Sequence, residues 1–119
     1  DGALEPEISL ETIPLKEGES TLLFPLEEVL YFEAYDNYAF CHDKEGRRIL
    51  CNYSLRTLEE RLPRHFVRVH RKYLANTQKI QAIQNHNKGR YVLTFDAHHR
   101  PKITSGATFQ ETVKAWTRL

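Results

Sequence analysis

The chain has 119 residues, of which 40% are hydrophobic and 11% aromatic, and its formal net charge is +1. This length and composition predict one folded domain with a hydrophobic core, and they exclude an intrinsically disordered chain. No apolar run is long enough to span a bilayer and no secretory signal is present, so we expect a cytoplasmic protein without a membrane partner.

The small net charge conceals a strong segregation of charge along the sequence. Residues 1–33 contain one base, Lys16, and nine acids: Asp1, Glu5, Glu7, Glu11, Glu17, Glu19, Glu27, Glu28 and Glu33. Residues 61–119 contain only two acids, Asp96 and Glu111, against twelve Lys and Arg and five of the six histidines. Opposed blocks of this kind produce a polar molecule with one cationic surface, which favours a polyanionic partner. An ordinary solvated surface is the alternative, because sequence halves need not be spatial halves.

The start of the chain predicts no regular element. Residues 1–11 carry Gly2, Pro6 and repeated Glu, which is typical of a linker or of the trimmed end of a longer protein. We therefore place the folded domain at residues 12–119. Short β-prone stretches then alternate with turns. They predict strands at Thr12–Leu15, Thr21–Phe24, Leu30–Ala34, Tyr38–His42 and Arg47–Cys51.

The two cysteines are predicted to be reduced structural thiols. A four-residue loop, residues 43–46, would join the strands that carry Cys41 and Cys51, and it would pair His42 with Arg47. In that register the two cysteines lie on opposite faces of the hairpin and cannot form a disulfide. Two cysteines are also too few for a disulfide scaffold.

The second half begins with a predicted helix. Ser54 can cap a helix over Leu55–Leu62, and Pro63 ends it. Residues 74–79 predict a turn or a single helical turn. Strands are predicted at Phe66–His70, Ile80–Gln84, Tyr91–Phe95 and Lys102–Thr104. The C-terminal segment is predicted to be helical from Ser105, or from Thr108 with Glu111 completing a capping box.

The segment Phe66–Asn76, FVRVHRKYLAN, is the main candidate for a binding site. Its alternation of apolar and polar residues breaks where two bases stand side by side. The strand end therefore gathers guanidinium, imidazole and ammonium groups from Arg68, His70, Arg71 and Lys72. Arg can offer two parallel donors to a phosphate or to a guanine edge. A solvated strand end with charges for solubility is the structural alternative.

The sequence predicts neither a metal site nor an enzyme. His98 and His99 are adjacent, so in a strand they point to opposite faces, and no other spacing suits a metal. The chain has no nucleophile turn, no paired carboxylates in a cleft-like context and no glycine-rich loop for phosphate. We therefore expect no catalytic residues, no metal and no cofactor.

Two further segments could contact a nucleic acid. The dense aromatics between residues 31 and 40 could stack on bases, although aromatics on short strands usually form a core; Asn37 and Tyr38, at a turn, are expected to be exposed. Lys102, Ser105 and Thr108 cluster at the predicted helix start, where free N–H groups and the helix dipole favour a phosphate. Simple capping by either hydroxyl is an equally expected role.

Three motifs occur in a specific order along the chain. They are Val29–Ala34 followed by the turn at Asn37-Tyr38, the helix Ser54–Leu62, and the pattern Phe66-x-Arg68-x-His70-Arg71-x-Tyr73-Leu74-x-Asn76 followed by Ile80. Together they resemble the LytTR family, the DNA-binding output domain of many bacterial response regulators. The resemblance spans about Thr12 to Trp116.

This resemblance implies a mostly β fold of about ten short, mainly antiparallel strands with one short internal helix and a C-terminal helix. It implies sequence-specific binding of duplex DNA by a transcriptional regulator, through loops and strand ends. Two copies of a domain that is monomeric in solution are expected on direct-repeat sites. A receiver domain is expected N-terminal to it, as in a two-component response regulator. The alternatives are a protein-interaction module with a basic face and a binder of single strands or RNA.

By position, the base readers of the family fall at residues 37–39, at the residue after His70 and at the start of the last helix. Arg71 suits the second place as a bidentate donor to guanine. Asn37 or Tyr38 would supply the first contact, because Ala39 is apolar. Many members have an Arg where this chain has Gly106-Ala107. The residues then assigned to phosphates are Arg68, Lys72, Lys102, Ser105 and Thr108.

Overall fold

The computed structural model describes residues 7–118, so Leu119 and the first part of the predicted linker at residues 1–11 lie outside the described residues. The strands are β1 (Thr12–Glu17), β2 (Ser20–Pro25), β3 (Val29–Tyr35), β4 (Tyr38–Asp43), β5 (Arg48–Cys51), β6 (Phe66–His70), β7 (Tyr73–Asn76), β8 (Ile80–Asn85), β9 (Tyr91–Phe95) and β10 (Lys102–Thr104). The α-helices are α1 (Leu55–Arg61) and α2 (Gln110–Lys114). Four 3-10 helices complete the described elements: η1 (Leu26–Glu28), η2 (Thr77–Lys79), η3 (Ala107–Phe109) and η4 (Ala115–Thr117). The predicted mostly β fold with an internal and a C-terminal helix is confirmed.

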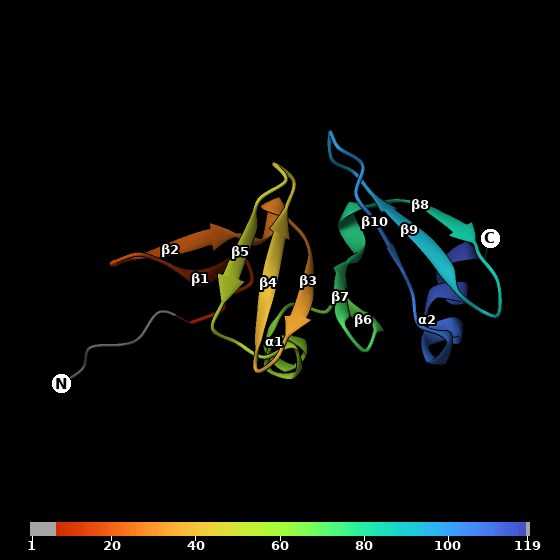
Figure 1. Ribbon diagram of the computed structural model, residues 1–119, viewed down its shortest axis with the longest axis horizontal. Helices are drawn as coiled ribbons and strands as arrows, with labels where there is room; N and C mark the ends of the chain where they lie inside the picture. The colour runs from red at the N-terminus through yellow and green to blue at the C-terminus, as the bar shows by residue number, and fades with distance from the viewer. Residues whose placement is uncertain (1–6, 119) are drawn as a thin grey trace.

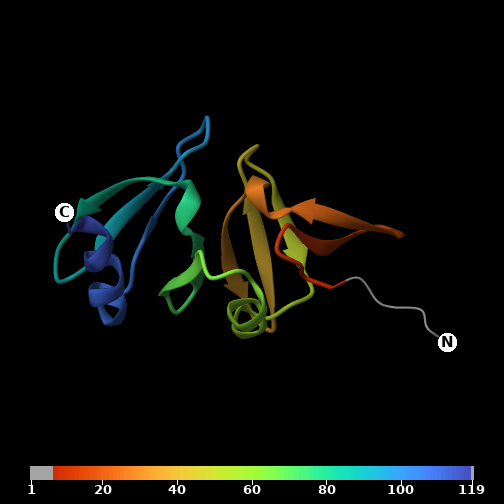
Figure 2. The same cartoon turned by 180° about the vertical axis from the view of Figure 1, so that it is seen from behind.

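The strands form three antiparallel sheets that follow one another along the long axis of the molecule (Figures 1 and 2). The five-stranded sheet, in the order β5-β4-β3-β7-β6, lies in the middle. The β1–β2 hairpin lies at one end, and the three-stranded sheet β10-β9-β8 with α2 lies at the other. Within residues 7–118, none of the helices has the length and apolar character needed to cross a membrane.

β3 is buried on both faces because it separates two hydrophobic cores. All four residues from Val29 to Phe32 are buried, and a β-bulge between Val29 and Tyr31 breaks the regular alternation. Val29 and Phe32 enter the first core, whereas Leu30 and Tyr31 enter the second. The central strand therefore links the two halves of the molecule.

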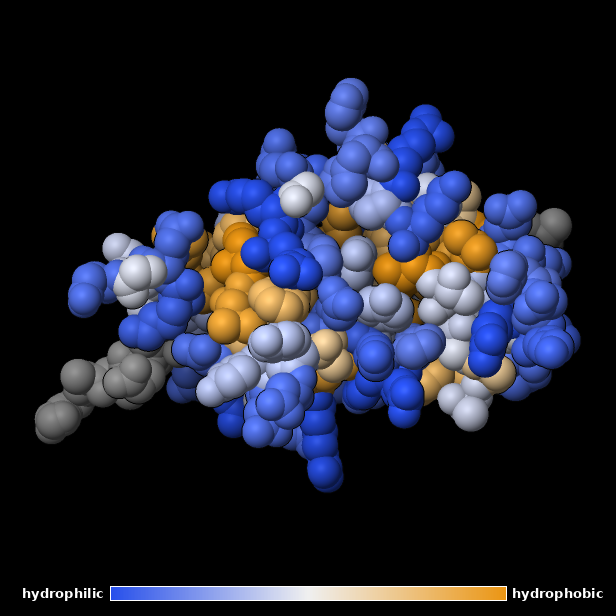
Figure 3. Space-filling view, viewed as in Figure 1, coloured by the Kyte–Doolittle hydropathy of each residue, from blue (hydrophilic) through white to orange (hydrophobic). Residues whose placement is uncertain are grey.

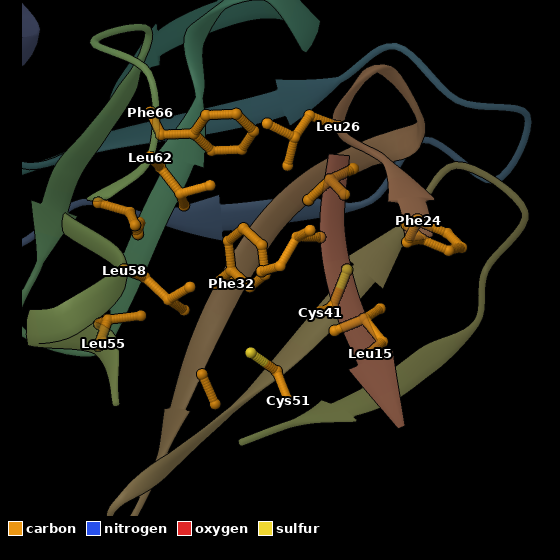
Figure 4. Close-up of a cluster of buried hydrophobic side chains, with 14 residues drawn as sticks. Leu15, Phe24, Leu26, Phe32, Cys41, Cys51, Leu55, Leu58, Leu62 and Phe66 are labelled. Atoms are coloured by element: carbon orange, nitrogen blue, oxygen red, sulfur yellow. The ribbon is translucent and has the colours of Figure 1, made fainter. Parts of the chain in front are cut away.

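The first core lies between the β1–β2 hairpin, the central sheet and α1 (Figure 4). Leu55 and Leu58 of α1 are buried there, and Ser54 caps the helix as predicted, since its Oγ accepts a hydrogen bond from Thr57 N–H at 3.1 Å. Phe32 is fully buried, with its ring centroid 5.9 Å from that of Phe66. α1 is thus a fixed support beside the sheet.

The second core joins the other face of the central sheet to the three-stranded sheet and α2. Its buried residues include Val69 of β6, Leu93 and Phe95 of β9, and Val113 of α2. Trp116 packs against it from the C-terminal segment. Because β6 contributes to this core just before the Arg71-Lys72 pair, the candidate binding segment is anchored by packing.

The predicted turn at residues 74–79 is wrong in its first half, where the chain forms β7. Leu74, Ala75 and Asn76 are buried in succession, since β7 lies between β3 and β6, so no alternation marks the strand. The buried Asn76 amide donates from Nδ2 to the Val29 carbonyl at 2.8 Å, and its Oδ1 accepts from Gln78 N–H at 3.0 Å. This side chain ends the strand and starts η2.

The predicted placement of the cysteines on opposite faces is also wrong. His42 pairs with Arg48 and Ala39 with Cys51, a shift of one residue from the predicted register, so both cysteines are buried in the first core (Figure 4). Both are free thiols. Burial raises the pKa of both, that of Cys51 to about 11, which keeps them protonated and poorly nucleophilic.

Candidate nucleic-acid interface

Three connections lie side by side along one long edge of the molecule, at the bottom of Figure 1. They are the β3–β4 turn with the first residue of β4 (residues 36–38), the β6–β7 turn with the last residue of β6 (residues 70–72) and the segment that leads from β10 into η3 (residues 105–108), and we call them the lower edge. Ala34 N–H donates to the Lys72 carbonyl at 2.8 Å, which joins the first connection to the second. Gly106 N–H donates to the Val69 carbonyl at 2.9 Å, which joins the second to the third.

The β3–β4 turn exposes a small polar and aromatic group. Tyr35 pairs with Tyr38, so Asp36 and Asn37 alone make the turn. Asp36 has a φ of 56°, in the left-handed region that Asp adopts more readily than bulky residues. Asn37 is exposed, and the exposed fractions of Tyr38 and Tyr35 are 45% and 55%. From the sequence, Tyr35 belonged to the aromatics that could stack on bases, but only Asn37 and Tyr38 were expected to be exposed, because the exposure of Tyr35 depends on where the strand ends.

The β6–β7 turn presents two bases from a tightly held backbone. His70 pairs with Tyr73, and Arg71 and Lys72 between them are both exposed. Lys72 N–H donates to His70 Nδ1 at 3.0 Å, while the Lys72 carbonyl accepts from Ala34. Within residues 7–118, no acidic side chain pairs with either base. Their charge is therefore available to an external anion.

Four cations surround His70. Desolvation lowers the pKa of His70 below its usual value, and repulsion from Arg71, Lys72, Arg90 and Arg68 lowers it further. Because Nδ1 accepts a hydrogen bond, the neutral ring carries its proton on Nε2. Arg90 was missed from the sequence, since only the fold brings the start of β9 beside β6. A phosphate bound here would relieve repulsion among four positive charges.

Arg68 is occupied within the protein, unlike the other bases assigned to phosphates. Its side chain is only 22% exposed and forms an ion pair with Glu59 of α1 at 2.7 Å. It also donates to the carbonyls of His70 and Arg71. The structure therefore does not present this guanidinium to a phosphate.

The third connection contradicts the phosphate role assigned to Ser105. Ser105 is buried, and its Oγ accepts from Tyr91 N–H at 2.9 Å while its own N–H donates to the Tyr91 carbonyl. Neither Ser105 nor Thr108 caps a helix, because the chain enters η3 from Gly106 without a side-chain cap. Thr108 is exposed on the lower edge.

Gly106 lies against His70 and Phe109. A Cβ at this position would stand 3.4 Å from both His70 Cδ2 and Phe109 Cδ2, at the short end of ordinary van der Waals contact. Lys102 is exposed at the start of β10, whose other end leads toward Ser105, so the structure does not bring it to the lower edge. The exposed candidates that remain there are Asn37, Tyr38, Arg71, Lys72 and Thr108.

The opposite edge also carries cations, but several of them are neutralised. The β4–β5 and β9–β10 hairpins border a cavity of about 250 Å³ lined by residues that include Tyr31, His42 and His99. Arg47 pairs with the buried Asp43 at 2.7 Å, and Lys44 pairs with Glu28 at 3.3 Å. Figure 3 shows hydrophilic side chains along both long edges, with apolar residues exposed between them. The distribution of charge alone therefore does not identify which edge binds an anion. The lower edge is favoured because exposed Arg71 and Lys72 have no acidic partner among residues 7–118 and lie beside two other connections.

Acidification should destabilise the fold through its histidines. Desolvation lowers the pKa of His42, His65 and His70 in the folded state, so the unfolded chain binds protons first as the pH falls. Their contribution is fully present above about pH 6.5, the unfolded pKa, and is lost as the pH falls through the folded values. We expect the free energy of unfolding, measured in urea, to change little near pH 7.5 and to decrease as the pH falls from about 6.5 to 5.5. A His70→Gln variant should show a shallower decrease, and an equally steep one would contradict this assignment.

Residues 19–118 match the family model described as the LytTR DNA-binding domain. The chain belongs to the LytTR DNA-binding domain family. This membership agrees with the resemblance found in the three sequence motifs.

Three curated relatives of this LytTR domain are named as regulators, two of them as transcriptional regulators. It is 35% identical over 81 residues to the CO-responsive transcriptional regulator RcoM of Rhodospirillum rubrum, covering 67% of this chain and 34% of the relative. It is 34% identical over 71 residues to a positive alginate biosynthesis regulatory protein of Pseudomonas aeruginosa, covering 60% of this chain and 28% of the relative. The transcriptional regulatory protein YpdB of Escherichia coli is 25% identical over 83 residues, covering 70% of this chain and 34% of the relative. The matched region thus spans about a third of each relative.

A solved structure shares the fold of this LytTR domain. It is described as the LytTR DNA-binding domain of a methyl-accepting/DNA response regulator from Bacillus cereus. The two superpose with a TM-score of 0.79 over 92% of this chain and 98% of the other, at 23% sequence identity. At this identity the likeness establishes the architecture.

Proposed function

We propose that this LytTR domain binds duplex DNA sequence-specifically through its lower edge, as the effector part of a transcriptional regulator in the cytoplasm. The observation that carries the proposal is the adjacency of three connections, with Arg71 and Lys72 exposed at the middle one and without an acidic partner among residues 7–118. Strand-end turns in a row can follow the backbone of a duplex, and Arg can read guanine bidentately. The names of the relatives support a regulatory role.

In this proposal the residues of the lower edge have different roles in binding DNA. Arg71 reads a base in the major groove, and Asn37 or Tyr38 supplies a second contact from the neighbouring turn. Lys72 and Thr108 contact phosphates, and His70 holds the turn beside them. Ser105 is left out because its hydroxyl is buried and bonded to β9. Arg68 is left out because its side chain is mostly buried and three of its five donors are used within the protein.

We further propose the wider setting that the family resemblance implies. The domain is a monomer in solution, and two copies occupy a direct-repeat site. In the full-length protein a receiver domain precedes it, as in a two-component response regulator. The Bacillus cereus protein, which shares the fold, is itself described as a response regulator.

Binding of a single strand or of RNA is the second candidate, favoured by the exposed Tyr35 and Tyr38. Anisotropy titrations should compare a duplex selected from a random library with its single strand and the equivalent RNA, at two salt concentrations. We expect the duplex to bind most tightly, with an affinity that falls as salt rises. Tighter binding of either single-stranded form would favour the alternative, and binding to none would leave the protein-interaction module.

Replacement of Lys72 by Ala should weaken binding to all duplex sequences to a similar degree. Loss of one phosphate contact removes about one released counterion, so the slope of log K against log salt should become shallower by about 0.9. Lys16→Ala is the matched control, since Lys16 is exposed in the distant β1–β2 hairpin. Equal salt slopes for Lys72→Ala, Lys16→Ala and the wild type would remove Lys72 from the interface.

A further inference from the structure

Arg68 uses two of its donors to hold the backbone of the β6–β7 turn and a third to bind Glu59. Its Nε donates to the His70 carbonyl at 3.0 Å and its Nη2 to the Arg71 carbonyl at 2.7 Å. Its Nη1 donates to Glu59 Oε1 at 2.7 Å. A planar guanidinium can satisfy these partners together because its donors form a rigid fork. These two carbonyls belong to the peptide groups on either side of the Arg71 Cα, from which the exposed side chain projects.

Glu59 connects this fork to a support outside the sheet. It lies on α1, which Ser54 caps and whose Leu55 and Leu58 are buried in the first core. Glu59 is nine residues from Arg68 in sequence and meets it only because α1 packs beside β6. The turn is therefore held by its own sheet partners and, through Arg68, by a separate helix.

The pairing of β6 with β7 explains why the turn requires additional hydrogen bonds to fix its backbone. The pairing of β6 with β7 shifts between Arg68 and His70, so the strand leaves regular register just before the turn. A two-residue connection after a bulge has fewer ladder hydrogen bonds to fix its direction. Arg68 supplies bonds to two carbonyls at this point.

We propose that Glu59 and Arg68 form a positioning clamp that sets the direction of Arg71 and so determines base specificity. The inference rests on the proposed function, since it requires that Arg71 reads DNA. Arg68 and Glu59 are positioning residues here and do not touch the duplex. The clamp makes a helix remote from the bases part of the specificity mechanism.

The clamp and a direct phosphate contact predict opposite effects for a neutral Glu59. Glu59→Gln removes a negative charge near a polyanion and frees Arg68, so a phosphate-contact role predicts binding that is stronger or unchanged on every sequence. The clamp predicts weaker binding to the selected duplex only, because a misdirected Arg71 loses its bidentate geometry. Arg68→Lys keeps the charge but loses the fork, so it should act in the same way.

The experiment measures the dissociation constants of the wild type, Glu59→Gln, Arg68→Lys and Glu60→Gln for the selected duplex and for a scrambled duplex. Glu60→Gln is the matched control, since Glu60 lies on the same helix and makes only a 3.8 Å exposed pair with Arg56. The dissociation constant for the scrambled duplex divided by that for the selected duplex measures discrimination. We expect this ratio to fall at least about fivefold in Glu59→Gln and Arg68→Lys, and to stay unchanged in Glu60→Gln. Urea unfolding establishes whether each variant is folded. If Glu59→Gln does not fold, the folded Arg68→Lys variant tests the clamp in its place.

An unchanged ratio in a folded Glu59→Gln or Arg68→Lys variant overturns the clamp. A gain in affinity that is equal on both duplexes and equal to that of Glu60→Gln also overturns it. If the wild type itself does not distinguish the two duplexes, the proposed function fails and the clamp fails with it. A loss of discrimination confined to the two clamp variants supports both.

Discussion

Replacement of Arg71 by Ala should weaken binding to the selected duplex by about 1–3 kcal/mol and relax the preference at one base pair. The reason is that a guanidinium offers two parallel donors to a guanine edge, and Ala offers none. The effect should be concentrated in this residue, because Gly106 and Ala107 at the third connection offer no side-chain donor to a base. Competition titrations with single-base-pair variants of the site measure it.

Arg48→Ala is the control for Arg71. Arg48 is an exposed Arg of the same charge, but it lies in the β4–β5 hairpin and stacks over Phe40 at 4.3 Å. Its replacement should leave the base preference intact. If Arg71→Ala lowered affinity for all sequences equally, Arg71 would be a phosphate contact and not a reader.

Replacement of Phe32 by Ala should destabilise the fold by about 3–5 kcal/mol. Phe32 is fully buried at the centre of the first core, next to Phe66, so the change leaves a cavity that neighbouring side chains fill poorly. A domain of this size has a total stability of about 5–15 kcal/mol, so the variant should approach the limit of folding. Urea unfolding followed by the fluorescence of Trp116, the one tryptophan, measures the change.

Trp116 packs against the second core, so this probe also tests whether β3 couples the two cores. We expect its transition to shift to lower urea although Phe32 belongs to the first core. Leu23→Ala is the control, since Leu23 is 60% exposed and its replacement should cost less than about 0.5 kcal/mol. A Trp116 transition unmoved by Phe32→Ala would mean that the cores unfold independently.

The sequence predicts the fold wherever a local signal marks an element. Phe66–His70 and Lys102–Thr104 match β6 and β10, and the Ser54 cap marks the start of α1. β7 escaped prediction because it is buried on both faces and shows no alternation. The hairpin register failed because Asp43 Oδ1 accepts from two backbone N–H groups, those of Glu45 and Arg47, and draws one more residue into the loop.

The candidate site was predictable in part for the same reason. Exposed Arg71 and Lys72 follow from the break in alternation, and their neighbours along the edge follow from the family pattern. The burial of Ser105 could not be predicted, because a serine that accepts from β9 and a serine that caps a helix look alike in sequence. The internal use of Arg68 depends on Glu59, and only the packing of α1 brings that partner near.

The most direct test of the central claim is an NMR titration of the backbone amides with the selected duplex. If the lower edge binds DNA, the largest shift changes should fall at Asn37, at Arg71 and Lys72, and at Gly106–Thr108, which join in one continuous surface. Shift changes concentrated instead in residues 44–48 and 98–100, at the opposite edge, would contradict the account.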